Sequence, residues 1–274
     1  MRELEQLRDR HRLGDAAVRR LEALVACVST DPAAPTTVRD PAAVVRDHLA
    51  DSLVALELRE VAAASRIADL GSGAGFPGLP LAIALPGSVV SLVESSARKC
   101  AFAARAITEC EASNARAVHA RAESWEAGLQ ACDLVTARAL APLAVVAEYA
   151  APLLRIGGTL VAWRGRRDPA DEAAAARAAV ELGLEPGPVV RVMPYDGALH
   201  RHLHLLTKVA PTPPRFPRRE GMARKHPLGA APQDGRSRQA TSAPQGEHCR
   251  PATSAPQDGR SALATTAPSD RSRR

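Results

Sequence analysis

The fold of this chain is decided by RIADLGSGAGFPGLP, residues 66–80. The stretch combines a short apolar strand, an acidic residue near its end, a glycine turn and the beginning of a helix. Glycines at alternate positions allow a tight turn and let the backbone approach a ligand closely. Pro77 suits the first turn of a helix, whose unpaired N–H groups face the glycine turn. The stretch therefore predicts a strand, a cofactor-binding loop and a helix in succession.

Strands and helices are predicted to alternate on both sides of this loop. Such alternation is typical of an α/β fold with a mostly parallel sheet, here of seven strands. Ligands bind such a sheet beyond the carboxyl ends of its strands, which points to the loops after residues 70, 93, 119 and 137. The predicted strands are 66–70, 88–93, 115–119, 133–137, 158–163, 189–193 and 202–208, and the predicted helices are 77–84, 97–110, 140–154 and 168–182.

The two ends of the chain differ from this central domain, which we place at residues 63–228. The apolar spacing in residues 1–62 predicts a helical cap. It consists of helices over 2–28, interrupted at Gly14-Asp15, and an amphipathic helix over 42–61. Residues 229–274 predict a disordered, low-complexity basic tail. Ala-Pro-Gln recurs there at positions 231, 243 and 255, and Ala-Pro-Ser follows at 267. Such a sequence has too few large apolar residues to form a core.

Composition limits the cellular setting. Of the Lys and Arg residues, 12 lie in 211–274 against five Asp and Glu, whereas 1–210 holds 24 against 25. The positive charge thus belongs to residues 211–274 and gives little support for a nucleic-acid partner by itself. Five cysteines without a Cys-x-x-Cys pair indicate reduced thiols in the cytoplasm. We expect no signal peptide and no membrane span.

The glycine loop fits two cofactor patterns. Gly73-x-Gly75-x-x-Gly78, with Glu94 further on, matches a dinucleotide fingerprint. Asp69-x-Gly71-x-Gly73-x-Gly75 matches the loop of methyltransferases that use S-adenosylmethionine. An acid after the second strand serves the ribose of either cofactor. We expect Asp69, Glu94 and Glu123 to follow strand ends, where they would suit a cationic ligand and repel a pyrophosphate, so the methyl donor is favoured.

The extended loop, from Asp69 to Ile83, resembles that of the bacterial glucose-inhibited division protein B family, also called ribosomal RNA small subunit methyltransferase G. The Phe-Pro-Gly-Leu-Pro continuation is specific to this family among such methyltransferases. Further matching segments are 47–53, 93–99, 121–123, 135–139, 201–208 and 216–228. The chain departs from the family where its usual Arg-His is Asp47-His48, and in the segment between Val28 and Val38.

The resemblance implies a class I, Rossmann-like fold and methylation of N7 of a guanine in 16S ribosomal RNA. It also implies S-adenosylmethionine as cofactor, the small ribosomal subunit as partner, a cytoplasmic location and a monomer. Two alternatives stay open: a methyltransferase of another substrate, or a non-enzymatic, cofactor-binding assembly factor. N7 carries a lone pair and no proton, so we expect no catalytic base.

Site residues follow from the resemblance by position. Gly71 and Phe76 would line the methyl donor, Glu94 would bind its ribose, and Ala122 and Glu123 its adenine. Arg138 would lie beside the methionine end or the incoming base, with its guanidinium directed at a carboxylate or a phosphate.

Charged and aromatic side chains outside the loop supply the remaining candidates. Arginines 164, 166 and 167 follow a strand end and suit RNA phosphate, as does Arg201, with Arg218, Arg219 and Lys225 as further candidates. We expect Trp125 and Trp163 to pack in the fold, and the His200-x-His202-x-His204 pattern to bind no metal.

Overall fold

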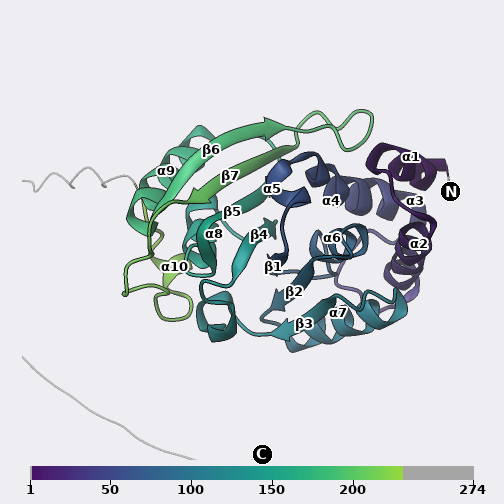
Figure 1. Cartoon of the computed structure of the whole chain (residues 1–274), viewed down its shortest axis with the longest axis horizontal. Helices are drawn as coiled ribbons and strands as arrows, with labels where there is room; N and C mark the ends of the chain where they lie inside the picture. Colours follow the sequence, from purple (N-terminus) through teal and green to yellow (C-terminus); the bar gives the residue numbers. More distant parts are fainter. Residues whose placement is uncertain (1, 231–274) are drawn as a thin grey trace, which may run out of the picture. The chain divides into compact units, whose positions relative to one another are not determined.

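The computed structural model describes residues 2–230. The predicted tail therefore lies almost entirely outside the described residues, and its prediction stays untested. Helices of the described part lie on both sides of a central sheet (Figure 1).

The sheet has seven strands in the order β3-β2-β1-β4-β5-β7-β6. The first five in this order pair in parallel, and β7 pairs antiparallel with both β5 and β6. This confirms the predicted mostly parallel sheet of seven strands. The strands are β1 (Arg66–Leu70), β2 (Val89–Glu94), β3 (Ala115–His119), β4 (Cys132–Arg138), β5 (Leu154–Arg164), β6 (Leu184–Arg191) and β7 (His202–Lys208).

Three elements of the central domain differ from their predicted bounds by more than two residues. β5 begins four residues before position 158, and β6 begins at Leu184 instead of 189. The added residues at the start of each strand include glycine, and those of β6 also include proline. These residues disfavour strands, so the sequence does not predict the extended conformation that pairing in the sheet imposes. The helix predicted over 140–154 is only α8 (Leu143–Ala150). The helices α6 (Gly78–Ala84), α7 (Ala97–Glu109) and α9 (Pro169–Leu182) lie close to their predicted positions.

The amino-terminal part begins with α1 (Arg2–His11) and α2 (Asp15–Thr30), separated at the predicted break. The single helix predicted over 42–61 is wrong, because the chain there forms a series of short elements. Leu58 adopts an extended conformation, with φ −87° and ψ 129°, which ends the helical path. The elements are α3 (Pro41–Val44), the π-helix η1 (Val45–Ala50), α4 (Asp51–Leu53), the 3-10 helix η2 (Val54–Glu57) and α5 (Arg59–Ala62).

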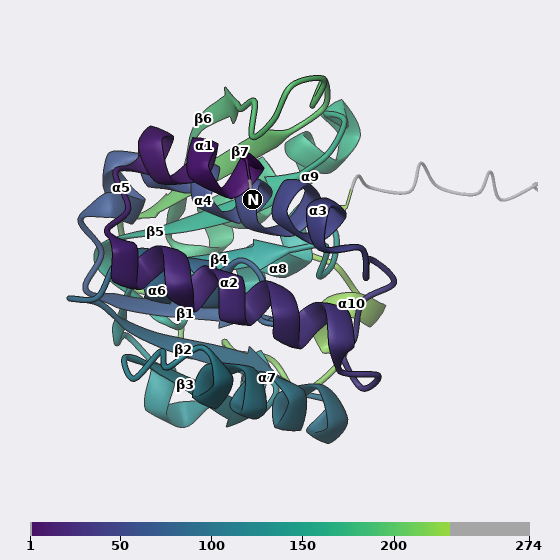
Figure 2. The same ribbon diagram turned by 90° about the vertical axis from the view of Figure 1, so that its right-hand side faces the viewer.

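Two apolar clusters hold the layers together. One joins the amino-terminal helices to α6, α7 and the sheet face beneath them, with Leu21, Leu53 and Phe102 fully buried. Figure 2 shows α1 and α2 in front of this face. The other cluster packs α8, α9 and α10 (Met222–Lys225) on the opposite face. Within residues 2–230, no helix is long and apolar enough to cross a membrane.

Candidate functional site

The glycine loop between β1 and α6 needs glycine at two positions. Gly71 has a φ of +67°, and a Cβ there would lie 2.6 Å from Cδ1 of Leu140. At Gly78 a Cβ would lie 2.7 Å from Cβ of Asp69. The Gly71 N–H donates to the carbonyl of Val93, at 2.8 Å. The loop is thus pressed against the ends of β2 and β4, as a cofactor-binding turn requires.

Asp69 supports this loop from beneath. It is the fourth residue of β1 and fully buried, so the expectation that it follows the strand end and faces a ligand is wrong. Its carboxyl accepts hydrogen bonds from the N–H of Gly78 at 3.0 Å and from the hydroxyl of Thr136 at 2.9 Å. Burial raises the pKa of Asp69 to about 7. Asp69 therefore joins the loop to the neighbouring strand β4.

Glu94 plays a similar part on the other side of the loop. It is the last residue of β2 and is 5% exposed. Its carboxylate accepts from the N–H of Gly73 at 3.1 Å and from that of Ser96 at 2.8 Å. Glu94 does not line the adjacent cavity described next. Its role at a ribose stays a prediction.

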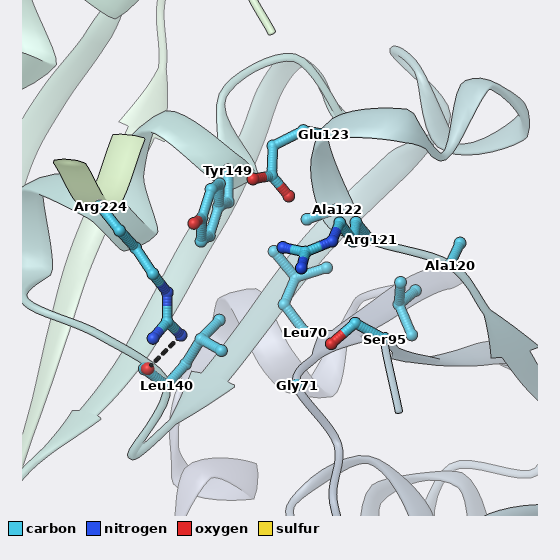
Figure 3. A pocket seen from close by; sticks show the side chains of 11 residues that line it. Leu70, Gly71, Ser95, Ala120, Arg121, Ala122, Glu123, Leu140, Tyr149 and Arg224 are labelled. Atoms are coloured by element: carbon cyan, nitrogen blue, oxygen red, sulfur yellow. Dashed lines mark hydrogen bonds between the residues drawn. The ribbon is translucent and has the colours of Figure 1, made fainter. Parts of the chain in front are cut away.

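A cavity of about 310 Å³ lies at the carboxyl ends of the strands β1, β2 and β3. Three of the predicted cofactor residues line it, Gly71, Ala122 and Glu123, as Figure 3 shows. Leu140, Tyr149 and Arg224 complete the wall nearest α8 and α10. The structure therefore brings together the predicted glycine-loop and adenine-binding segments.

Phe76 and Arg138 belong to a neighbouring cluster and do not line this first cavity. The ring of Phe76 lies 4.7 Å from that of His48, centroid to centroid, and Cζ of Arg138 lies 5.5 Å from its centroid. Arg138 pairs with Asp51 at 3.0 Å, which confirms the expectation that its guanidinium faces a carboxylate. Burial, and then the charge of Arg138, lower the pKa of His48.

A second cavity, of about 440 Å³, opens at the carboxyl ends of β4 and β5 beneath the η1 segment. Arg138, Arg164, Arg166 and Arg201 all line it, whereas the fourth predicted RNA-binding arginine, Arg167, does not. The second cavity is therefore rich in guanidinium groups.

The arginines of this region differ in how far other groups already neutralise them. Arg164 pairs with Asp171, and Arg167 forms two hydrogen bonds with Glu172. Arg201 lies 3.2 Å from Oδ1 of Asp51. Among the described residues, the side chain of Arg166 has one hydrogen-bond partner, Nε2 of His200, at 3.3 Å.

Arg218 has a structural role instead of the phosphate-binding role considered for it. Both of its forked N–H groups donate to the carboxylate of Glu148, which is 2% exposed. The two tryptophans pack in the fold as expected, and Nε1 of Trp163 donates to the carbonyl of Asp51 at 2.7 Å.

The histidine pattern on β7 is explained by local contacts. His204 is 4% exposed and burial lowers its pKa, while Nδ1 of His202 lies 2.8 Å from the carbonyl of Gly165. In the part of the chain that the structure describes, no three His, Cys, Asp or Glu side chains are grouped to hold a metal ion.

Asp51, Tyr149 and Arg224 are among the cavity residues that the sequence did not assign to the site. Asp51 lies in a segment that carried the family resemblance, but nothing in the sequence placed its side chain against Arg138. No periodicity or spacing marks Tyr149 or Arg224, because each reaches its cavity only through the packing of α8 and α10.

Comparison with known proteins now decides the family. Residues 33–193 match the model of the family rRNA small subunit methyltransferase G, or GidB. This chain belongs to that family. The span contains the glycine loop, Glu123, Arg138 and the arginines that follow β5, whereas Arg201 and Arg224 lie beyond it.

Individual members of the methyltransferase G family match along most of their own length. A ribosomal RNA small subunit methyltransferase G from Chloroflexus aggregans is 46% identical over 197 residues, which cover 70% of this chain and 82% of that protein. The Roseiflexus protein of the same name is 42% identical, with 70% and 83% covered. That of Desulfitobacterium hafniense is 37% identical, with 70% and 81% covered.

Proposed function

We propose that this chain transfers a methyl group from S-adenosylmethionine to N7 of a guanine in 16S ribosomal RNA of the small subunit. Membership of the methyltransferase G family supports the reaction and its substrate. The observation that carries the proposal is the position of the two cavities, which lie on either side of the loop that follows β4. Ala139 lines the arginine-rich cavity, and the next residue, Leu140, lines the cavity at the glycine loop.

The cavity at the glycine loop fits a cationic nucleoside better than a dinucleotide. Glu123 lines it directly, and Arg121, one of its two arginines, is paired with Glu220 at 3.1 Å. The close approach of Leu140 to Gly71 leaves no room for a Cβ. Ala122 and Glu123 would hold the adenine, with the carboxylate accepting from its amino group. When bound, S-adenosylmethionine supplies a methyl group on a positively charged sulfur.

The arginine-rich cavity would receive the guanine and its flanking phosphates. Because N7 carries a free lone pair, the chain has to orient the base and need not remove a proton. Alignment of two reactants can contribute up to about 7–11 kcal/mol to catalysis. Arg138 would stand between the two cavities, and its pairing with Asp51 reduces the repulsion between its guanidinium and a cationic donor.

Mass spectrometry of 16S ribosomal RNA tests this proposal. A strain that lacks the gene should lose one N7-methylguanosine, and the wild-type gene should restore it. Arg138→Ala should fail to restore the mark, whereas Arg105→Ala should restore it, because Arg105 pairs with Asp31 on the surface, away from both cavities. An unchanged RNA from the deletion strain would refute the proposal and favour another substrate or a non-enzymatic role.

The remaining features of the proposal concern the whole chain. Residues 1–62 would act as a cap over a methyltransferase domain formed by 63–228, followed by a tail over 229–274. The enzyme would act on RNA in the cytoplasm. It would act as a monomer, and sedimentation of the purified protein checks this oligomeric state.

A further inference from the structure

The segment after β7 returns across the molecule to the cavity at the glycine loop. Phe216 is 7% exposed and belongs to the apolar cluster around α8. Two residues further on, Arg218 forms an ion pair with the buried Glu148 of α8. We call residues 211–228 the carboxyl-terminal strap. The strap lies wholly beyond residues 33–193, which match the family model.

The carboxyl-terminal strap holds one side of the cavity in position. The N–H of Gly221 donates to Oε1 of Glu123 at 3.0 Å, and Glu220 pairs with Arg121 at 3.1 Å. The carboxylate of Glu123 is therefore oriented by a backbone group that lies about a hundred residues away in sequence. Removing the strap would leave both side chains without these partners.

Arg224 of the carboxyl-terminal strap reaches the cavity itself. Its guanidinium donates to the carbonyl of Leu140 at 2.9 Å, and the Leu140 side chain covers Gly71. Figure 3 shows Arg224 and Leu140 on one side of the cavity and Ser95 and Ala120 on the other. The guanidinium thus lies beside Leu140 and Tyr149, across the cavity from Ser95 and Ala120.

The two ends of the cavity match the two ends of the methyl donor. The adenosine end requires acceptors, which Glu123 offers beside Ala122. The amino-acid end carries a carboxylate, which requires a cation. Two arginines line the cavity, and Arg121 is already paired with Glu220. Arg224 has five N–H groups. They contact the carbonyl of Leu140 and the hydroxyl of Tyr149, and no ion pair among the described residues includes Arg224.

We propose that Arg224 binds the α-carboxylate of the methyl donor. This inference rests on the proposed function, because it takes S-adenosylmethionine as the ligand of the cavity. An arginine fork meets a carboxylate through two parallel charge-assisted hydrogen bonds, which fix the orientation of the ligand as well as its affinity. The strap would thereby supply a cofactor-binding residue from outside residues 33–193, which match the family model.

The test uses two ligands that differ at the amino-acid end. S-adenosylhomocysteine carries the α-carboxylate, and 5′-methylthioadenosine has the same nucleoside without it. Isothermal titration of the full chain should show that Arg224→Ala weakens S-adenosylhomocysteine about tenfold or more and leaves methylthioadenosine unchanged. Arg215→Ala is the matched control, because Arg215 is an exposed arginine of the same strap that pairs with Glu181 and does not line the cavity. It should bind both ligands as the wild type does.

Other outcomes are equally informative. Equal weakening of both ligands by Arg224→Ala would overturn the inference, because the arginine would then support the shape of the cavity and not the carboxylate. Unchanged binding of both ligands would also overturn it. A wild-type chain that binds neither ligand would refute the proposed function itself. Arg224 is exposed, so its replacement should leave thermal unfolding unchanged, which separates lost contact from lost folding.

Discussion

Replacing Asp69 with asparagine should change how stability depends on pH. Burial raises the pKa of Asp69 from 3.8 to about 7, so the folded chain holds a proton that the unfolded chain releases. Stability is therefore lost as pH rises from 3.8 towards 7. The pKa difference corresponds to about 4 kcal/mol in total, of which more than half develops between pH 5 and pH 8.

Asparagine removes this titration and keeps the contacts. Its carbonyl oxygen can accept from the N–H of Gly78, and its amide can donate to the hydroxyl of Thr136, so both partners that Asp69 now holds stay satisfied. D69N should therefore gain stability over the wild type as pH rises. The gain between pH 5 and pH 8 should be about 2–3 kcal/mol and should develop mainly below pH 7.

Equilibrium urea unfolding at four pH values between 5 and 8 measures this difference. D9N, which removes an exposed carboxyl on α1, controls for the loss of one charge, and its curve should run parallel to that of the wild type. A difference between D69N and the wild type that stays constant across the range would refute the reasoning. It would mean that the two hydrogen bonds outweigh burial and keep Asp69 ionised in the folded chain.

Four further substitutions test the roles assigned to the arginines. Arg166→Ala should flatten the dependence of log affinity for RNA on log salt concentration by about one unit, whereas Arg164→Ala should leave the slope unchanged, because a neighbouring carboxylate already neutralises that guanidinium. Filter binding over a salt series shows whether the slopes differ, and equal slopes would contradict the assignment. Arg218→Ala leaves the carboxylate of Glu148 buried without its partner and should lower the free energy of unfolding by about 3–5 kcal/mol. Arg215→Ala breaks an exposed ion pair and should cost less than about 1 kcal/mol; similar losses in both variants would show that burial of the pair does not matter.

The alternating elements of the sheet were predictable from the sequence because each carries its own local pattern. The strand 66–70 and the strand 202–208 have the predicted bounds. The region 42–61 was not predictable in the same way. Its apolar spacing suits one long helix, but the hydroxyl of Ser52 donates to the carbonyl of His48 at 2.6 Å, and the His48 ring packs on Phe76. Contacts with the rest of the fold shape this segment, and they leave no trace in its periodicity.

The site was predictable to the extent that it depends on the glycine loop and the strand ends. Gly71, Ala122 and Glu123 line one cavity, and their contacts with the cofactor stay predictions. The role of Asp69 was misjudged, because an acid near a strand end can face a ligand or cap the turn beneath it, and only burial distinguishes the two. Arg224 was missed because its place depends on a segment that crosses the molecule after the last strand. Residues that meet through such long returns carry no shared spacing in the sequence.

The carboxylate of Asp51 is shared between two cations that face the arginine-rich cavity. One oxygen lies 3.0 Å from Arg138 and the other 3.2 Å from Arg201. An anion that binds Arg201 and breaks its ion pair with Asp51 would leave Asp51 paired with Arg138 alone. The ion pair between Asp51 and Arg138 would then become stronger. Linkage is reciprocal. If an anion at Arg201 changes the affinity of a second ligand that moves Arg138, that ligand must change the affinity of Arg201 for the anion by the same factor. One acidic side chain thus makes the two arginines thermodynamically dependent on each other.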